Sequence, residues 1–330
     1  MAEVKDSGHI RLVGAIAGMG SGLSKARTTV IWHPRLPWLL DTGEDGRVDD
    51  RHEGGIVSFD TVKTRLQCSP PGTYRGAIDC LVKISPFALY KGATPPAVGW
   101  AAIDSVLLGS LHNYRLFLIR HGMTEPVAGT EVRRLSLTGH SVAGLGAGLT
   151  SAILATPIEH LKIRLQMQSQ RAVADREFKG PLDCARQVVR SRGVLGLWSG
   201  FTGSLAFRAN FCWMFGSVEI LMRSFASLKG TSFEMSTGTA NFLAGGLASF
   251  SFWIMAIPAD NLKNRMMASP VGMPAPSFTS TMRHVYTTVG LRGFFAGLTP
   301  CFLRAFPTNA CAYYAYEGLM RTFGAEKTRH

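Results

Sequence analysis

The chain has 330 residues and a formal net charge of +13, yet only 17% of its residues are charged and 46% are hydrophobic. Soluble domains usually carry about 25% charged residues, so this composition argues against an ordinary soluble protein, and the high apolar content excludes intrinsic disorder. The six cysteines form no CxxC pair, which excludes a disulfide-rich secreted scaffold. A nucleic-acid-binding protein and a polytopic membrane protein remain.

Long apolar segments decide between these two classes. Residues 240–258 contain no charge, residues 135–158 contain only His140, and residues 93–111 contain only Asp104. Stretches of about 18 or more nearly uncharged residues are transmembrane candidates. A nucleic-acid-binding protein would instead gather Lys and Arg on a stripe with interleaved aromatic residues, and the sequence has no such stripe. We therefore predict a membrane protein with no nucleic-acid partner.

One ten-residue pattern occurs three times along the chain, as SFDTVKTRLQ (58–67), PIEHLKIRLQ (157–166) and PADNLKNRMM (258–267). An aromatic–x–Gly triplet follows each copy, and a second apolar stretch follows each triplet. Such self-similarity indicates tandem structural repeats. The predicted repeats are 8–125, 132–228 and 236–324. The predicted spans are 10–25 continued by 58–68, then 94–118, 134–167, 201–226, 238–267 and 298–322.

Closely spaced small residues open the first span of each repeat, as in Gly144-Gly146-Gly148 and Gly245-Gly246-Ala248. Small residues at such spacing let membrane helices approach closely. A dinucleotide-binding loop is the competing interpretation. It fails because no predicted strand precedes these glycines and no phosphate-binding context follows them.

The pattern P-x-[DE]-x-x-[KR]-x-[KR], three times at intervals of about 100 residues, resembles the signature of the mitochondrial carrier family. The aromatic triplets Tyr90-Lys91-Gly92, Trp198-Ser199-Gly200 and Phe295-Ala296-Gly297 extend the resemblance over nearly the whole chain. It implies an all-α membrane protein with six transmembrane helices in three two-helix repeats, related by pseudo-threefold symmetry, with short matrix helices between the spans. It also implies a multi-pass protein of the mitochondrial inner membrane that contacts anionic lipids, cardiolipin among them.

The expected activity is transport by alternating access around a site near the middle of the membrane. An enzyme is not expected, because the sequence contains no metal-spaced His/Cys cluster, no nucleophile elbow and no Gly-rich phosphate loop. We accordingly expect no cofactor and no metal, and we expect the protein to act as a monomer.

The repeated acidic and basic residues are three positions apart, so each pair shares one helix face. Six such charges facing lipid would cost on the order of 15–20 kcal/mol, so they must face one another. Threefold pseudo-symmetry predicts three pairs: Asp60–Lys162, Glu159–Lys263 and Asp260–Lys63. By resemblance these pairs form the gate on the matrix side, which closes when they form. The alternative is a permanent plug of ion pairs that holds the bundle together.

Neighbouring residues complete the expected gate. Pro157 and Pro258 precede two of the acids and are predicted to kink their helices, whereas serine takes this place in the first repeat. The resemblance implies that Gln67 and Gln166 brace two of the pairs from below. Met267 takes the third glutamine position, so this brace is expected to be absent.

Three further charged residues, Asp104, Arg208 and Arg304, lie inside even-numbered spans. Ionisable groups inside a membrane are candidate functional residues, and the guanidinium fork of arginine suits carboxylates. We expect both arginines to bind a substrate carboxylate, with Asp104 holding an ammonium group or neutralising an arginine. Trp100 and Asn309 are candidate wall residues. The alternative is an arginine that pairs with Asp104 only to satisfy its burial.

The substrate class follows from these arginines. The segment RAFPTNA around Arg304 resembles the sixth helix of the carnitine/acylcarnitine and ornithine carriers. Members of that branch carry an acid after the arginine that matches Arg208, whereas this chain has Ala209. An amino acid, an acylcarnitine and a di- or tricarboxylate all remain candidate substrates.

The first repeat contains surplus sequence. Gly18 and Ser58 are 40 residues apart, whereas Gly144 and Pro157 are 13 apart, a surplus of 27. Residues 26–57 hold six acids and four arginines, too many charges for the middle of a membrane. They are either a translated intron or gene-model error, or a regulatory loop that enters the transport path. Because this first repeat is damaged, the alternative function is that of a carrier-like membrane protein that has lost transport and is a scaffold or a pseudogene product.

These two interpretations make opposite predictions. A messenger RNA without most of the codons for residues 26–57 would exclude the regulatory loop. If the chain exists as written, we expect impaired folding or transport, because the first repeat must hold these charges outside the membrane. Uptake by this form at the rate usual for the family would contradict that expectation.

Overall fold

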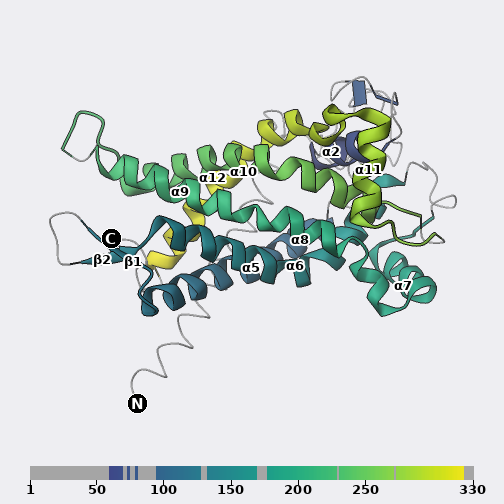
Figure 1. Ribbon diagram of the computed structural model, residues 1–330, viewed down its shortest axis with the longest axis horizontal. Coiled ribbons are helices and arrows are strands. Elements are labelled where there is room, and N and C mark those ends of the chain that lie inside the picture. Colours follow the sequence, from purple (N-terminus) through teal and green to yellow (C-terminus); the bar gives the residue numbers. More distant parts are fainter. Residues whose placement is uncertain are drawn as a thin grey trace, which may run out of the picture.

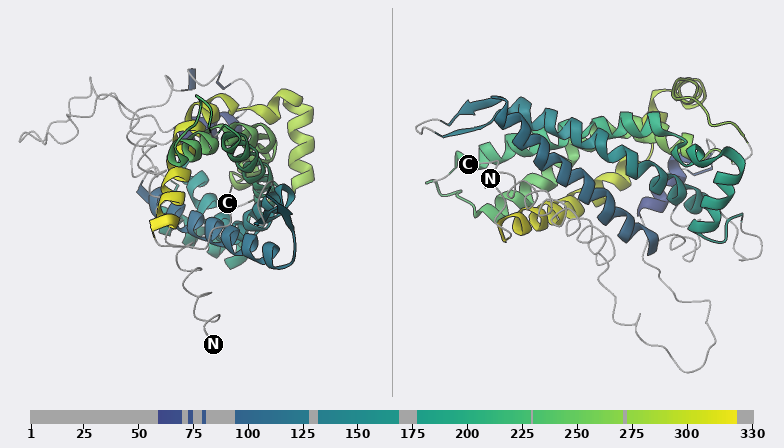
Figure 2. Two further views of the ribbon diagram at one scale, coloured as in Figure 1. Left: turned by 90° about the vertical axis from the view of Figure 1, so that its left-hand side faces the viewer. Right: turned by 90° about the horizontal axis from the view of Figure 1, so that it is seen from below.

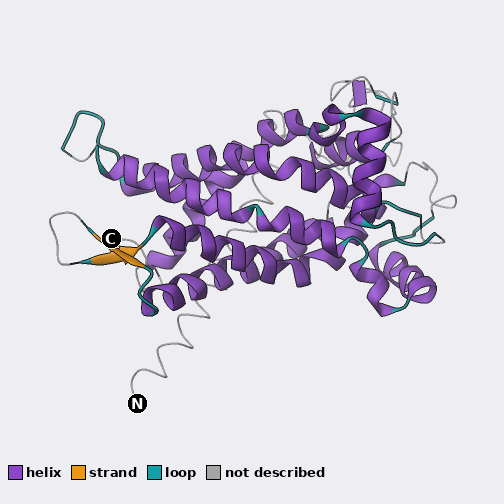
Figure 3. Cartoon of the chain, in the orientation of Figure 1, coloured by secondary structure: helices purple, strands orange, loops and turns teal. Residues whose placement is uncertain are grey.

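The computed structural model describes residues 59–69, 73–74, 79–80, 94–127, 132–168, 177–228, 230–270 and 273–322. It is an elongated bundle of helices (Figures 1 and 3). Helices α5 (Thr94–Arg120), α6 (Leu137–Met167), α10 (Thr237–Met267) and α12 (Leu298–Thr322) run along its length. The end-on view in Figure 2 shows the long helices arranged around a common axis.

Two of the long helices have the length and apolar composition of membrane spans. These are α6 and α10, each of 31 residues, among the residues that the structure describes. Both bury several alanines and glycines, and both also expose large apolar side chains, for example Ile153 and Ile254. Small residues at helix contacts and exposed large apolar side chains suit a bundle surrounded by lipid. The predicted span 10–25 lies outside the described residues.

The span predicted at 201–226 is wrong in one respect, because the structure divides it into α8 (Phe201–Ala209) and α9 (Phe211–Ala226). The break is at Asn210, whose backbone N–H bonds to the carbonyl of Phe207 rather than to that of Ala206. The Asn210 side-chain amide donates to the Ala206 carbonyl instead, at 2.9 Å. A side chain that competes for backbone groups in this way interrupts a helix without proline.

The span predicted from residue 134 also begins later than expected. Residues Arg133–Leu135 form strand β2, which pairs antiparallel with β1 (Thr124–Pro126). The hairpin lies at one end of the bundle (Figure 1). Helix α6 begins at Leu137 because the Ser136 hydroxyl oxygen accepts the N–H of Gly139 at 3.1 Å and so caps its first turn.

The other end of the bundle carries shorter helices. One of the short helices expected between the spans is α7 (Pro181–Arg192), followed by the 3-10 turn η2 (Val194–Trp198). Their counterparts in the last third of the chain are α11 (Phe278–Val289) and η3 (Leu291–Phe295). Helix α2 (Phe59–Cys68) packs at this same end, against α6, α10 and α12.

The buried face of α7 packs on the end of α6. Cys184 and Val188 form an apolar cluster with Leu165 and Phe178, and all four are at most 6% exposed. Burial raises the pKa of the Cys184 thiol to about 11. The thiol is therefore neutral at physiological pH and behaves as a small apolar side chain.

This burial predicts that Cys184 does not react with maleimide at pH 7.5 while the protein is folded. The reactive thiolate forms only as the pH approaches 11, and folding stability from this group falls as the pH rises from the ordinary thiol pKa toward that value. Mass spectrometry of labelled protein should find Cys184 modified only near the unfolding temperature. Rapid labelling of the native protein would show that α7 does not pack as described.

Candidate functional site

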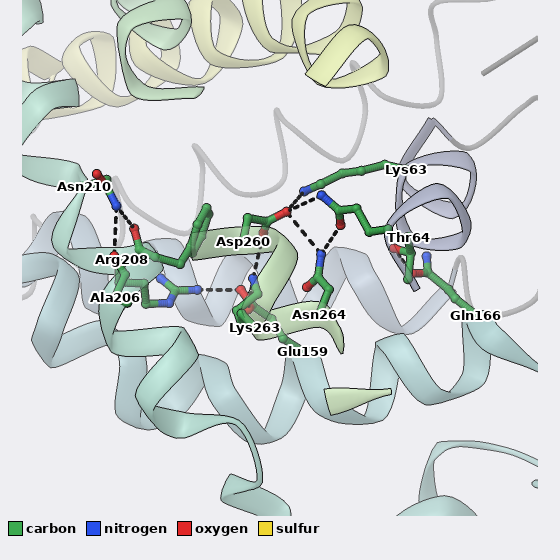
Figure 4. A network of polar contacts seen from close by, with 12 residues as sticks. Lys63, Thr64, Glu159, Gln166, Ala206, Arg208, Asn210, Asp260, Lys263 and Asn264 are labelled. Atoms are coloured by element: carbon green, nitrogen blue, oxygen red, sulfur yellow. Dashed lines mark hydrogen bonds and ion pairs between the residues drawn. The ribbon is translucent and has the colours of Figure 1, made fainter. Parts of the chain in front are cut away.

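A network of buried charges joins three helices near the α7 end of the bundle (Figure 4). Lys63 of α2 lies 2.8 Å from Asp260 of α10, and Lys263 of α10 lies 2.8 Å from Glu159 of α6. Lys263 also contacts Asp260 at 3.1 Å. These are two of the three pairs expected from the repeat register. Their side chains are between 1% and 20% exposed, so each charge needs its partner.

The third expected pair, Asp60–Lys162, lies partly outside the described residues. Lys162 is in α6 and is partly buried. Asp60 is in α2, but its side chain is not among those described. The pairing of these two residues therefore stays a prediction.

Arg208 joins the charge network, which the sequence did not predict. Its Nη2 lies 2.7 Å from Oε1 of Glu159, and its Nη1 donates to the hydroxyl of Ser151 at 2.9 Å. Glu159 thus holds two cations at once, Arg208 on one oxygen and Lys263 on the other. Ser151 belongs to no motif that recurs in the repeats, so the sequence offered no signal for this contact.

The two glutamines expected as braces contact neighbouring repeats. Gln67 donates to Oδ2 of Asp260 at 3.0 Å, the same oxygen that Lys63 contacts, and accepts a hydrogen bond from Asn264. Gln166 accepts from the hydroxyl of Thr64 at 3.2 Å. Gln67 therefore lies where a brace for the Lys63–Asp260 pair was expected.

Thr64 and Asn264 occupy the same place in their repeats, between the two basic residues of the motif. Each bonds to the glutamine of another repeat. The equivalent residue of the second repeat is Ile163, and the remaining glutamine place holds Met267. Both are buried. The contact between the second and third repeats therefore has apolar residues at the two motif positions that are polar in the other two contacts between repeats. The position between the two basic residues of the motif was thus a sequence signal for these contacts, as the glutamine position was.

Aromatic rings cover both lysines. The Nζ of Lys63 lies 4.4 Å from the ring centroid of Trp253, and that of Lys263 lies 4.1 Å from the ring centroid of Phe207. Such contacts stabilise a desolvated cation by about 2 kcal/mol. The two prolines predicted to kink their helices, Pro157 and Pro258, lie inside α6 and α10, each two positions before its acid.

Of the other four candidate substrate residues, the structure describes two side chains. Asp104 lies in α5 and is 5% exposed. Asn309 lies in α12, where its amide donates to the Ala305 carbonyl of its own helix at 3.0 Å. Trp100 and Arg304 lie in α5 and α12, and their side chains are outside the described set. The grouping of these residues into one substrate site therefore stays a prediction.

A second polar cluster lies at the hairpin end. Arg223 of α9 contacts Glu125 of β1 at 2.6 Å and Glu219 of its own helix at 2.8 Å. Glu219 also lies 3.4 Å from the ring of His140, a buried histidine of α6. The hairpin is thereby fixed to the ends of α6 and α9.

Comparison with known proteins identifies the family. A model described as mitochondrial carrier protein matches residues 133–229 and 235–327. The chain belongs to the mitochondrial carrier family. Mitochondrial substrate carrier family protein L of Dictyostelium discoideum is 32% identical over 273 residues, which cover 80% of this chain and 89% of that protein. Members of the family are transporters rather than enzymes, and they are proteins of the mitochondrial inner membrane.

Other relatives are named for different solutes. A carnitine/acylcarnitine carrier-like protein of Arabidopsis thaliana is 32% identical over 292 residues, covering 81% of this chain and 92% of that protein. The glutamate/glycine mitochondrial carrier ymc1 of Schizosaccharomyces pombe is 30% identical over 269 residues, covering 78% and 86%. Family membership of this carrier therefore fixes the class of activity, and its solute must be argued from its own residues.

Proposed function

We propose that this carrier moves a small carboxylate-bearing metabolite across the mitochondrial inner membrane by counter-exchange. The observation that carries the proposal is the buried guanidinium of Arg208, which is 3% exposed and lies inside the bundle beside the charge network. The three pairs expected from the repeats hold equal numbers of acids and bases. Arg208 adds one more cation, which favours an anionic group on the solute.

In this proposal six spanning helices in three repeats surround the transport path, as in the family. The Glu159–Lys263 and Lys63–Asp260 pairs, with Asp60–Lys162, close the path at the α7 end and separate when it opens. Arg208 and Arg304 bind the carboxylate, and Asp104 binds an ammonium group or balances an arginine. Trp100 and Asn309 line the path. The carrier works as a monomer whose surface contacts cardiolipin.

Counter-exchange by purified protein in proteoliposomes tests the proposal. Vesicles preloaded with L-glutamate, glycine, L-carnitine or malate should take up the same labelled solute, and external unlabelled solute should compete. Glycinamide, which lacks the carboxylate, and Mg²⁺, which has the opposite charge, serve as controls. Exchange of a carboxylate without exchange of either control supports the proposal. Transport of Mg²⁺ alone, or of no carboxylate, would contradict it.

A further inference from the structure

The proline inside α6 removes a backbone hydrogen bond from that helix. Pro157 has no N–H, so the carbonyl of Ile153, four residues earlier, loses its usual helical partner. Ile153 is 59% exposed and therefore lies on the outer side of the bundle, where a carbonyl without a hydrogen bond is costly in lipid. The indole Nε1–H of Trp198 donates to this carbonyl at 2.9 Å. Trp198 thus replaces the bond that the proline removes.

The turn that contains Trp198 also bonds to α6 on the other side of the proline. Nε2 of His160 lies 2.7 Å from Nε of Arg164, and it must be the acceptor because a guanidinium can only donate. Nδ1 of His160 therefore carries the proton and donates to the carbonyl of Leu197 at 3.2 Å. Leu197 and Trp198 are adjacent in η2, so this one turn is bonded to α6 both before and after Pro157.

The third repeat has no equivalent bridge among the residues that the structure describes. Pro258 leaves the carbonyl of Ile254 without its helical partner in the same way, and Ile254 is also exposed. Phe295 takes the place of Trp198 in the aromatic triplet, and its ring has no N–H to donate. Asn261, three residues after Pro258, donates to two backbone carbonyls in and beside η3, both at 2.9 Å. The described hydrogen bonds thus join η3 to α10 after the proline but not before it.

The residue that this bridge positions is Glu159, two places after Pro157. One of its oxygens lies 2.7 Å from Arg208 and the other lies 2.8 Å from Lys263. A change in the direction of α6 at Pro157 moves Glu159 relative to both cations, and a displacement of about 1 Å takes either contact beyond ordinary hydrogen-bond range. The two contacts therefore require the part of α6 after the proline to keep one direction.

We propose that Trp198 is a positioning residue of the carrier. Its hydrogen bond fixes the direction of α6 across Pro157 and thereby holds Glu159 between its two cations. The third repeat lacks such a bond among the described residues, so α10 changes direction at Pro258 more readily than α6 does at Pro157. The inference concerns the charge network and names no solute, so it can fail while the proposed function stands.

Hydrogen–deuterium exchange of the full-length protein in nanodiscs tests the inference without any solute. The backbone amides of residues 151–162 in α6 should exchange more slowly than those of the equivalent residues 252–263 in α10. Trp198→Phe introduces the ring that the third repeat has, and it should speed exchange in 151–162 about tenfold, as expected when one hydrogen bond of ordinary strength is lost. Exchange in 252–263 should not change. A general loss of stability would instead accelerate exchange in both segments.

The matched control is Trp213→Phe. Trp213 of α9 is 50% exposed, and its indole makes no hydrogen bond to the residues that the structure describes. This variant makes the same chemical change without removing a bond to α6. Exchange in both segments should therefore match that of the unaltered protein.

A double-mutant cycle shows whether Trp198 acts through Glu159. Lys263→Gln removes one partner of Glu159, and its effect on the unfolding temperature is measured in the unaltered protein and in Trp198→Phe. If Glu159 is no longer held in place, its pair with Lys263 is already weakened, and the fall in the second background should be at least about 2 °C smaller than in the first. A purely local role of the indole bond would give equal falls.

Three results overturn the inference. Equal exchange of the two segments in the unaltered protein removes the difference between the repeats, and this result needs no variant that folds. Exchange in 151–162 that Trp198→Phe leaves unchanged, or that rises equally in both segments, shows that the indole bond does not fix α6. Equal falls in unfolding temperature show that Trp198 does not hold Glu159. Slower exchange in α6, its selective loss in Trp198→Phe and the smaller fall together support the positioning role.

Discussion

Replacing Arg208 by alanine is expected to reduce carboxylate exchange at least about 100-fold, because two losses coincide. The solute loses its guanidinium partner, and Glu159 loses one of its two cations inside the bundle. Initial rates of exchange in proteoliposomes, normalised to the amount of reconstituted protein, would measure the effect. A loss this large is typical when one partner of a buried hydrogen-bonded charge pair is removed.

The matched control for this variant is Arg283→Ala. Arg283 is an exposed arginine of α11, so its removal changes the net charge by the same amount without disturbing the charge network. We expect its exchange rate to equal that of the unaltered protein. Exchange by Arg208→Ala at the rate of this control would remove Arg208 from the substrate site and leave it a structural residue.

Replacing Lys263 by glutamine is expected to cause the largest loss of stability among the described charges. Lys263 contacts Glu159 at 2.8 Å and Asp260 at 3.1 Å, so its neutralisation leaves two buried carboxylates short of a cation. Breaking a buried pair in this way costs about 3–5 kcal/mol. The unfolding temperature should fall by roughly 6–20 °C at the usual few degrees per kcal/mol for a chain of this size.

Thermal unfolding in detergent would measure this loss, with Lys179→Gln as the control. Lys179 is exposed, so its neutralisation should leave the unfolding temperature within about 1 °C of the original. If Lys263→Gln unfolds at the same temperature as the control, the closed arrangement of the pairs does not contribute to the stability of the resting protein.

Sequence periodicity predicted most of the helical architecture because apolar composition and repeat spacing are local properties of the chain. The ranges 94–118, 238–267 and 298–322 agree closely with α5, α10 and α12. The break at Asn210 and the hairpin before α6 were missed. The break and the start of α6 each depend on a single side chain, Asn210 or Ser136, that competes with or caps backbone groups, and averages over a window do not register such an event.

The charged pairs Glu159–Lys263 and Lys63–Asp260 were predictable from sequence, because three equivalent motifs around one axis leave few ways to pair buried charges. Their role as a gate remains a proposal. The hydrogen-bond donors Thr64 and Asn264 also recur in register, between the two basic residues of the motif. Comparison of this position across the three repeats predicts them in the same way.

The sequence by itself thus determined the family, the helical membrane architecture that the family implies, and which acids and bases recur in register. Only the tertiary structure decided that Arg208 binds Glu159 and Ser151, which precede it by 49 and 57 residues. No periodic pattern links those positions. The contact exists because close packing at Gly148 and Gly203 brings the last turn of α8 against α6 and α10, where the buried guanidinium needs a partner.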